Sequence, residues 1–409
     1  MNKTKLTDNI FMLSANIDHM LFESMWDVPH GVSLNSYIVK GEKTAIIDGI
    51  IGWDGLPESL YAHLKEFDIT PESIDYLVIN HIEPDHSGWI ENFKKITNDF
   101  TVVMTKKAEA MLYSFYGETP MDTMIVKEGD SLDLGKGKKL TFHPIPNIHW
   151  PETMMTFEED SKMLFPCDMY GAFGTIKDTM FDDQFTKEDR VFYEKESIRY
   201  YSNVMATFSK MTKKAIEKTR ELNPFVIAPG HGPVYRENPS TIIDAYARYA
   251  EYASGKGKNE VTILWGSMYG MTGKAVEKIK TMIEAKGITV NDVRMPQTTS
   301  SEMVTNVFKS AGVIVAAPTY EYKMFPPVAH AIDELGRKKI SGKKAFRTGS
   351  YGWSGGAEKD FNKIIENVKM KWDFLESVEF EGSPNEEAIK SIEHSINTLC
   401  ETMQENIIE

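Results

Sequence analysis

The sequence predicts an α/β chain of two domains: an α+β sandwich with stacked sheets inside and helices outside, then a doubly wound parallel sheet. The length of 409 residues suits two or three domains. Short strand signals with helices between them fill the first part, whereas strands and helices alternate regularly in the second. The segment Ser254–Asn259 is polar and rich in Gly and Lys, as linkers are. We therefore expect domains over residues 1–254 and 260–409.

The first domain is expected to contain several short strands, each an apolar or alternating run. They cover Ser36–Val39, Thr44–Ile47, Tyr76–Ile79, Phe100–Met104, Leu140–Ile145 and Met163–Phe165. Helical periodicity marks Ser59–Glu66, Ala108–Phe115 and a long stretch, Glu188–Glu221. Strands in runs with helices between them favour stacked sheets covered by helices.

The second domain shows repeated strand–helix–strand units. The expected strands are Val261–Trp265, Thr289–Arg294, Gly312–Ala317 and Lys344–Thr348. The expected helices are Gly273–Ala285, Glu302–Lys309, Phe325–Arg337, Gly356–Val368 and Asn385–Asn406. Buried strands joined by helices in this way indicate a parallel sheet with helices on both faces.

Composition excludes several classes of protein. The 46 Lys and Arg against 60 Asp and Glu give a net charge of −14, and this field repels nucleic acid. No apolar run approaches the roughly 20 residues of a membrane helix. Asp8 and Asn9 interrupt the place where a signal peptide is apolar, so we expect a cytoplasmic protein. Cys167 and Cys400 are too few for a disulfide framework or a thiolate metal site.

Four potential metal ligands stand close together in the chain: His81, Glu83, Asp85 and His86. They follow the apolar strand Tyr76–Ile79 directly, and a loop leaving a strand can turn several side chains toward one point. Imidazole with carboxylate suits iron or manganese and tolerates zinc. Burying these groups together without a metal would leave unpaired charge, so the cluster predicts a metal site.

Three further donors follow other apolar strands or turns: His149, Asp168 and His231. Such positions at strand ends commonly carry functional residues. Together the set holds four His and three carboxylates, which is enough for two metals with one bridging carboxylate. The other six His residues are interpreted as ordinary turn or surface residues.

The segment from His81 to His86 resembles the metallo-β-lactamase superfamily, with its H-x-H-x-D-H pattern and later His, Asp and His. Glu83 stands where the second His is usual, and this departure matches the flavodiiron proteins. The resemblance implies a metallo-β-lactamase-like αββα sandwich with two irons, since an extra anionic ligand stabilises a more oxidised metal. It also implies the metal ligands. One iron takes His81, Glu83 and His149, the other takes Asp85, His86 and His231, and Asp168 bridges them.

Three loops at the ends of second-domain strands predict a site for a ligand that carries a phosphate and a planar ring. The first joins a strand to a helix with hydroxyls, a glycine and free backbone N–H groups, and it has no Walker lysine. The other two offer aromatic rings to a planar ligand. The candidate residues are Ser267, Met268, Tyr269, Gly270, Met271 and Thr272, then Pro318, Thr319 and Tyr320, then Ser350, Tyr351, Gly352, Trp353 and Gly356.

In this order the loops resemble flavodoxin, which implies a flavodoxin-like domain that binds FMN. The S-M-Y-G form of the first loop departs from the usual T-x-T-G-x-T and occurs commonly in flavodiiron proteins. Trp353 and Tyr320 are the expected ring contacts. A lactamase-like domain followed by a flavodoxin-like domain is more specific for the flavodiiron family than either domain alone.

The resemblance implies an oxidoreductase that removes O2 or NO. Two Fe(II) ions and FMNH2 hold four electrons, which is what O2 needs to become two waters, whereas reducing two NO to N2O needs two. We place O2 reduction slightly ahead. Tyr193, Tyr200 and Tyr201 could donate a proton near the site, although core packing explains them equally well.

Partners follow from the same resemblance. Family members form head-to-tail dimers that set the FMN of one subunit against the irons of the other, and we expect the same here. The sequence does not distinguish a dimer from a tetramer. Because the chain has no C-x-x-C pair, we expect a separate electron donor, rubredoxin or reduced coenzyme F420. The alternatives are a di-zinc hydrolase with an accessory flavodoxin domain, which Glu83 disfavours, and a pure electron carrier, which the full ligand set disfavours.

Overall fold

The computed structural model describes residues 2–18, 21–50, 64–117, 122–176 and 180–408. These form two compact units, the first spanning residues 1–201 and 210–246 and the second residues 202–209 and 247–409. The predicted domain ranges, 1–254 and 260–409, stay a prediction. Within the described part of the chain, we find no helix with the length and apolar character needed to cross a membrane.

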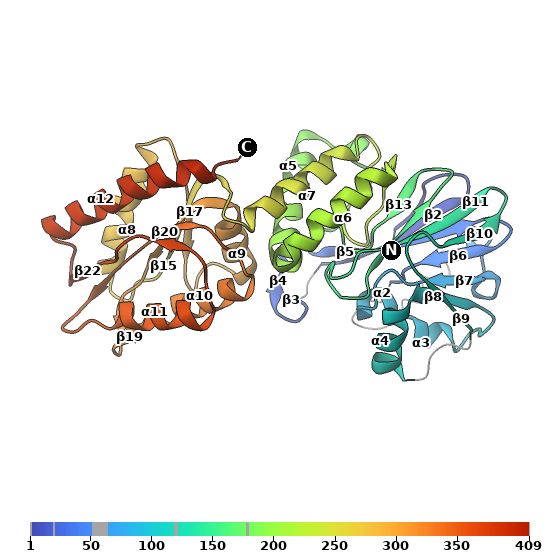
Figure 1. Cartoon of the computed structure of the whole chain (residues 1–409), viewed down its shortest axis with the longest axis horizontal. Coiled ribbons are helices and arrows are strands. Elements are labelled where there is room, and N and C mark those ends of the chain that lie inside the picture. Colours follow the sequence, from blue (N-terminus) through green and yellow to red (C-terminus); the bar gives the residue numbers. More distant parts are fainter. Residues whose placement is uncertain (1, 19–20, 51–63, 118–121, 177–179, 409) are drawn as a thin grey trace. The chain divides into compact units, whose positions relative to one another are not determined.

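Two sheets lie at the centre of the first unit (Figure 1). The described strands of one, in spatial order, are β1 (Asn2–Lys5), β2 (Ile10–Ile17), β5 (Val32–Lys40), β6 (Thr44–Ile47), β7 (Tyr76–Val78), β8 (Thr101–Thr105) and β9 (Asp122–Val126). Those of the other are β10 (Ser131–Gly135), β11 (Lys138–Pro144), β12 (Met154–Glu158), β13 (Met163–Phe165) and β14 (Val226–Ile227). A short hairpin joins β3 (Leu21–Phe22) to β4 (Trp26–Asp27). Strands β6 to β9 are parallel, and so are β13 and β14.

Successive side chains along a strand point to opposite faces of the sheet, and in this unit each face packs into its own core. On β2, Ile10 and Met12 join the core shared by the two sheets, where they meet residues such as Phe142 of β11. The intervening Phe11 and Leu13 face the opposite way, into a second core with helices. Because both faces of this part of the sheet are buried, the four residues from Ile10 to Leu13 are all apolar, unlike those of a half-exposed strand.

The helices of the first unit cover the sheets. They are α2 (Pro84–Ser87), α3 (Ile90–Phe93), α4 (Lys106–Tyr116), α5 (Lys187–Tyr200), α6 (Ser209–Leu222) and α7 (Ser240–Tyr252), of which α7 runs on into the second unit, with short turns η1 (Pro71–Ser73) and η2 (Asp182–Gln184). The helix predicted over residues 59–66 falls largely outside the described residues.

The continuous helical stretch predicted over Glu188–Glu221 is wrong. A π-helical turn, η3 (Tyr201–Met205), and a 3₁₀ turn, η4 (Ala206–Phe208), separate α5 from α6. The irregular turn frees the carbonyl of Asn203, which accepts a hydrogen bond from Lys338 Nζ, while Asn203 Nδ2 donates to the carbonyl of Ser301. These contacts within the second unit override local helical periodicity.

The second unit is a parallel sheet between helices. Its described strands, in spatial order, are β16 (Thr289–Arg294), β15 (Lys258–Trp265), β17 (Ser310–Ala316), β20 (Lys344–Tyr351) and β21 (Asp373–Phe374), and β22 (Val378–Glu381) also pairs with β20. The helices are α8 (Met271–Glu284), α9 (Ser300–Lys309), α10 (Pro326–Arg337), α11 (Ala357–Asn367) and α12 (Glu386–Thr402), followed by η5 (Met403–Asn406). In Figure 1, α8 and α12 cover one face, and α10 and α11 cover the other. A hairpin, β18 (Thr319–Tyr320) and β19 (Lys323–Met324), follows β17.

Candidate metal centre and flavin pocket

The seven predicted metal donors come from four loops of the first unit, and the structure brings all of them together. The loop after β7 carries the first four, since Pro84 begins the short helix α2 and α2 turns Asp85 and His86 inward. His149 lies between β11 and β12, Asp168 follows β13, and His231 follows β14. Each loop leaves the end of a buried strand, so the rigid sheets fix the positions of the donors.

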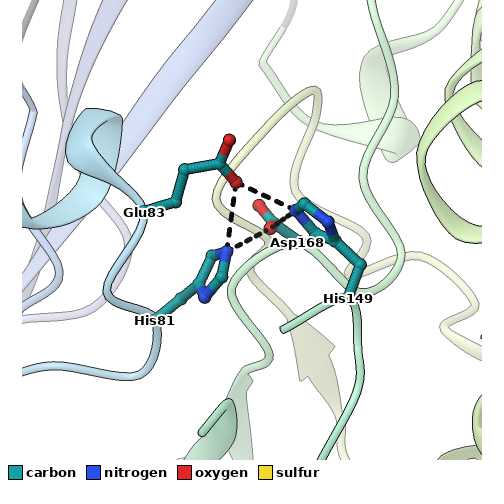
Figure 2. A group of neighbouring side chains, drawn as sticks. All are labelled: His81, Glu83, His149 and Asp168. Atoms are coloured by element: carbon teal, nitrogen blue, oxygen red, sulfur yellow. Dashed lines mark hydrogen bonds and ion pairs between the residues drawn. The ribbon is translucent and has the colours of Figure 1, made fainter. Parts of the chain in front are cut away.

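One group of donors surrounds His81 and His149, as Figure 2 shows. Glu83 Oε2 lies 3.2 Å from His81 Nε2 and 2.9 Å from His149 Nε2. Asp168 Oδ2 lies 3.2 Å from each of the same two nitrogens. Two imidazoles and two carboxylates therefore converge on one point.

A second group surrounds His86 and His231. Asp85 Oδ2 lies 3.5 Å from the Nε2 atom of each imidazole. Asp168 Oδ1 lies 3.0 Å from His86 Nε2 and 3.1 Å from His231 Nε2. Asp168 thus offers one oxygen to each pair of imidazoles and joins the two groups.

The electrostatics of the cluster favour positive charge. Burial on its own lowers the pKa of each imidazole, but the carboxylates beside them outweigh it. The pKa of His81 and of His149 rises to about 10 and that of His86 to about 9. Burial alone would raise the pKa of Asp168, yet the surrounding imidazoles hold it well below its usual value. A pocket that stabilises protons on its imidazoles also stabilises metal cations in their place.

The donors fit a pair of metal ions. Two ligands on one ion, each bonded at about 2.0–2.2 Å, lie about 2.8–3.6 Å apart. The distances from 2.9 to 3.5 Å found here match that spacing in both groups. Asp85 Oδ1 is buried and has no hydrogen-bond partner among the described residues. Buried carboxylate oxygens in that condition are costly unless a cation satisfies them.

Cys167 also lies beside His86 and Asp168. Burial, with Asp48 and Asp168 nearby, raises the pKa of its thiol well above the usual value. Without a cation beside it, this thiol holds its proton.

A cavity of about 410 Å³ opens in the second unit at the carboxyl ends of the parallel strands. This is the position and size typical of ligand pockets in such folds. Eleven of the candidate flavin residues line it: Ser267, Met268, Tyr269, Met271, Pro318, Thr319, Tyr320, Ser350, Tyr351, Gly352 and Trp353. Trp353 is 87% exposed and Tyr269 is 84% exposed, so both residues are available to a planar ligand.

The remaining three candidates do not line the cavity. Gly270 adopts φ +85° at the start of α8, where its N–H donates to Ser267 Oγ. Thr272 is buried and pairs its hydroxyl with Ser350 Oγ at 2.8 Å. At Gly356 an added Cβ would lie 2.3 Å from the carbonyl oxygen of Tyr322, so this glycine permits close packing of two loops. These three residues support the loops that line the pocket and do not line it themselves.

Four residues that line the cavity are not among the candidates: Glu321, Tyr322 and Ser354, which belong to the predicted loops, and Gly382, which does not. Glu321 and Tyr322 turn the β18–β19 hairpin with positive φ, a geometry that no local pattern announced. Among the described lining residues, Glu321 is the charged side chain. Hydroxyls and backbone N–H groups at the start of α8 are therefore the available partners for a phosphate, as in other phosphate cradles.

Comparison with known proteins gives the same two parts. Residues 32–232 match the ODP family β-lactamase model, and residues 263–395 match the flavodoxin model. A nitric oxide reductase of Moorella thermoacetica is 30% identical over 371 residues, which cover 90% of each chain. An anaerobic nitric oxide reductase flavorubredoxin of Vibrio vulnificus is 32% identical, over 84% of this chain and 70% of that one.

Comparison with solved structures also places the chain near flavodiiron proteins. Rubredoxin oxygen:oxidoreductase from the anaerobe Desulfovibrio gigas superposes with a TM-score of 0.91 at 25% identity and covers 99% of both chains. A flavo di-iron protein of Thermotoga maritima superposes with a TM-score of 0.87 at 26% identity over 98% of both. The chain belongs to the flavodiiron family. The predicted fold and resemblance are thereby confirmed, and the protein is an oxidoreductase.

This flavodiiron protein also positions its donors with groups that the sequence did not reveal. Glu152 is buried, and its Oε1 lies 2.7 Å from His81 Nδ1 and accepts a hydrogen bond from the backbone N–H of Ile82. The carbonyl of Ser33 lies 2.9 Å from His231 Nδ1. Both contacts leave Nε2 of the imidazole facing the cluster and fix the ring orientation. Glu152 and His81 are 71 residues apart, so a single sequence carries no signal for the pair.

Replacing Glu152 by alanine is expected to weaken iron binding about 10- to 100-fold, because His81 loses the carboxylate that orients it. Metal titration of the apoprotein measures the change. Glu152→Gln is the matched control, since its amide oxygen can still accept from His81 and Ile82, and it should lose much less. Equal losses in the two variants would contradict the orienting role.

Proposed function

We propose that this flavodiiron protein reduces O2 to water and NO to N2O at a two-iron site, with FMN as the local source of electrons. The names of its relatives support both substrates, since the Moorella relative is a nitric oxide reductase and the Desulfovibrio neighbour is a rubredoxin oxygen:oxidoreductase. The greater weight on O2 stays a prediction.

The position of Asp168 carries this proposal. Its two oxygens each face one pair of imidazoles at 3.0–3.2 Å, which is how a carboxylate holds two ions side by side. His81, Glu83 and His149 would hold one iron, and Asp85, His86 and His231 would hold the other. With Glu83 the set includes three carboxylates, which favour iron over zinc.

In the second unit, the eleven candidate residues that line the cavity would hold FMN. Ser267 and the backbone at the start of α8 would bind the phosphate, and Tyr320 and Trp353 would contact the ring. When bound, FMN and the two irons supply the electrons that O2 or NO requires. The protein residues hold these groups and deliver protons.

Two assemblies complete the proposal. A separate electron donor, a rubredoxin or reduced coenzyme F420, reduces the flavin, and two chains pair head to tail so that each FMN serves the irons of the other subunit. The name of the Desulfovibrio neighbour supports a rubredoxin. Mixing subunits of Asp168→Asn with subunits lacking FMN tests the pairing: recovery of turnover supports it, and inactive mixed dimers contradict it.

The direct test starts from purified protein. We expect a yellow protein with one FMN and two irons per chain that consumes O2 and NO when reduced anaerobically. Parallel turnover of one reduced sample with each gas ranks the substrates. Two zinc ions per chain with hydrolysis of esters or thioesters would overturn the proposal in favour of the hydrolase alternative.

Tyr200 is the expected proton donor among the three predicted tyrosines. It is buried, its ring centroid lies 5.7 Å from that of His231, and its hydroxyl has no hydrogen-bond partner among the described residues. The hydroxyl of Tyr193 instead donates to the carbonyl of Thr175, and the ring of Tyr201 packs against Tyr246.

Replacing Tyr200 by phenylalanine is expected to lower turnover about tenfold or more while iron and FMN contents stay unchanged, because a proton source is lost without a ligand. Steady-state rates and metal analysis measure both quantities. Tyr193→Phe is the control and should keep its rate. A Tyr200→Phe enzyme with unaltered turnover would assign this tyrosine to packing alone.

A further inference from the structure

A buried arginine lies in the second unit, on strand β20. The side chain of Arg347 is 1% exposed, and its Nη2 donates to Glu379 Oε1 at 2.6 Å. Its Nε and Nη1 have no hydrogen-bond partner among the described residues. The guanidinium carbon lies 5.7 Å from the ring centroid of Phe361, on the first turns of α11.

The partner of this arginine reaches the flavin pocket. Glu379 pairs with Gly349 in the β20–β22 register, and its Oε2 lies 3.3 Å from the point where a Cβ on Gly355 would stand. Gly355 belongs to the loop of residues 352–356, whose Gly352, Trp353 and Ser354 line the cavity. The Arg347–Glu379 pair therefore lies directly behind the loop that carries the exposed indole.

The burial of Arg347 makes its charge costly, since this side chain is 1% exposed and that of Glu379 is 19% exposed. A guanidinium taken out of water loses solvation, and donors left without partners add to the cost. The pair is formally neutral, but removing either member leaves one uncompensated charge close to the pocket. Charges in such a partly desolvated place act over several ångströms with little screening.

We infer that Arg347 and Glu379 are positioning residues that support the 352–356 loop and set how readily the FMN bound there is reduced. Each electron added to the flavin brings negative charge into the pocket, and a nearby cation stabilises that charge. Arg347 acts through Glu379, which neutralises it and contacts the loop. The inference rests on the proposed binding of FMN in the second unit.

The charges of the two residues predict the direction in which each variant changes the reduction potential of FMN. Glu379→Gln leaves Arg347 uncompensated and should raise the FMN reduction potential, so that reduced FMN binds tighter relative to oxidised FMN by about fivefold or more. Arg347→Met leaves Glu379 uncompensated and should lower the potential. The double variant is neutral again and should return toward the native value. Arg347→Lys keeps the charge and should rescue most of the effect.

Spectroelectrochemical titration of the flavin measures the potential, and fluorescence titration with FMN measures affinity. Lys344 and Asp373 form the matched control, since they pair at 2.8 Å on the same sheet but are 23% and 66% exposed. Lys344→Met and Asp373→Asn should leave the potential unchanged.

Shifts of opposite sign for the two variants establish the inference. Shifts of the same sign, or none, overturn it, because loss of loop packing alone has no reason to follow charge. If Arg347→Met fails to fold, Glu379→Gln and Arg347→Lys still decide the sign. A chain that takes up no FMN at all would refute the proposed function. Normal FMN binding, with changes in reduction potential that do not follow the sign of the charge, would refute this inference only.

Discussion

Asp168→Asn is expected to remove both irons and to lower turnover with O2 and NO at least about 100-fold. Asparagine has the shape of aspartate but only one oxygen and no charge, so it cannot offer an anionic oxygen to each imidazole pair. The four imidazoles then lose a carboxylate that lies 3.0–3.2 Å from the Nε2 atom of each of them. Iron analysis of the purified variant and gas-consumption rates measure the outcome.

Asp85→Asn is the matched comparison. Asp85 Oδ2 lies 3.5 Å from Nε2 of His86 and of His231, the two imidazoles of one group, so we expect loss of one iron and retention of the other. The FMN content should stay native in both variants, since the flavin cavity belongs to the second unit. An Asp168→Asn protein that keeps two irons would contradict the bridging position.

The candidate metal donors could be proposed from the sequence because local patterns place them at the ends of strands. His81 to His86 follow a buried strand, and Asp168 and His231 each follow another, so the topology of a sandwich brings the strand ends to one edge. The division of the donors into two groups came from the family resemblance. The distances now give the same division from geometry alone.

Contacts between distant segments were beyond prediction. Glu152 contacts His81 from a distant segment, and Arg347 lies on a strand of mixed apolar and polar residues, where the sequence does not show which polar side chain is buried. The sequence pattern favours a helix through residues 188–221 and does not predict the break after Tyr200. The break is explained by the hydrogen bonds of Asn203 to Ser301 and Lys338, which lie far away in the sequence. Sequence patterns report which side of an element is buried, but not which partner it meets.

The sequence predicts the ends of some strands and misses another strand altogether. The ends of β6 and β13 match the prediction, because Lys43 and Asp48 flank the first run and Lys162 and Pro166 flank the second. Strand β12 was missed, although it is buried along its whole length. Strand β12 follows the loop that holds His149. The turn residues of that loop favoured a longer loop in the prediction, so the strand after them was not recognised.

Glu83→His is expected to convert the site from iron toward zinc and to abolish gas reduction, with turnover falling at least about 100-fold. Glu83 Oε2 lies 2.9 Å from His149 Nε2, so it occupies a ligand position next to both imidazoles of its group. Histidine there replaces an anionic oxygen by a neutral nitrogen, which favours zinc and disfavours the more oxidised iron. Protein expressed with equal iron and zinc, then analysed for both metals, measures the change.

Glu83→Asp and Glu83→Gln separate charge from shape. Aspartate keeps an anionic oxygen on a shorter side chain and should retain iron with reduced affinity, whereas glutamine keeps the length without the charge and should behave like histidine. Zinc uptake by Glu83→His with new hydrolysis of a thioester would show that a single position divides the two chemistries of this sandwich. If Glu83→His and Glu83→Gln both retain two irons and native rates, the carboxylate at this position does not select the metal, and the preference for iron must come from the other six donors.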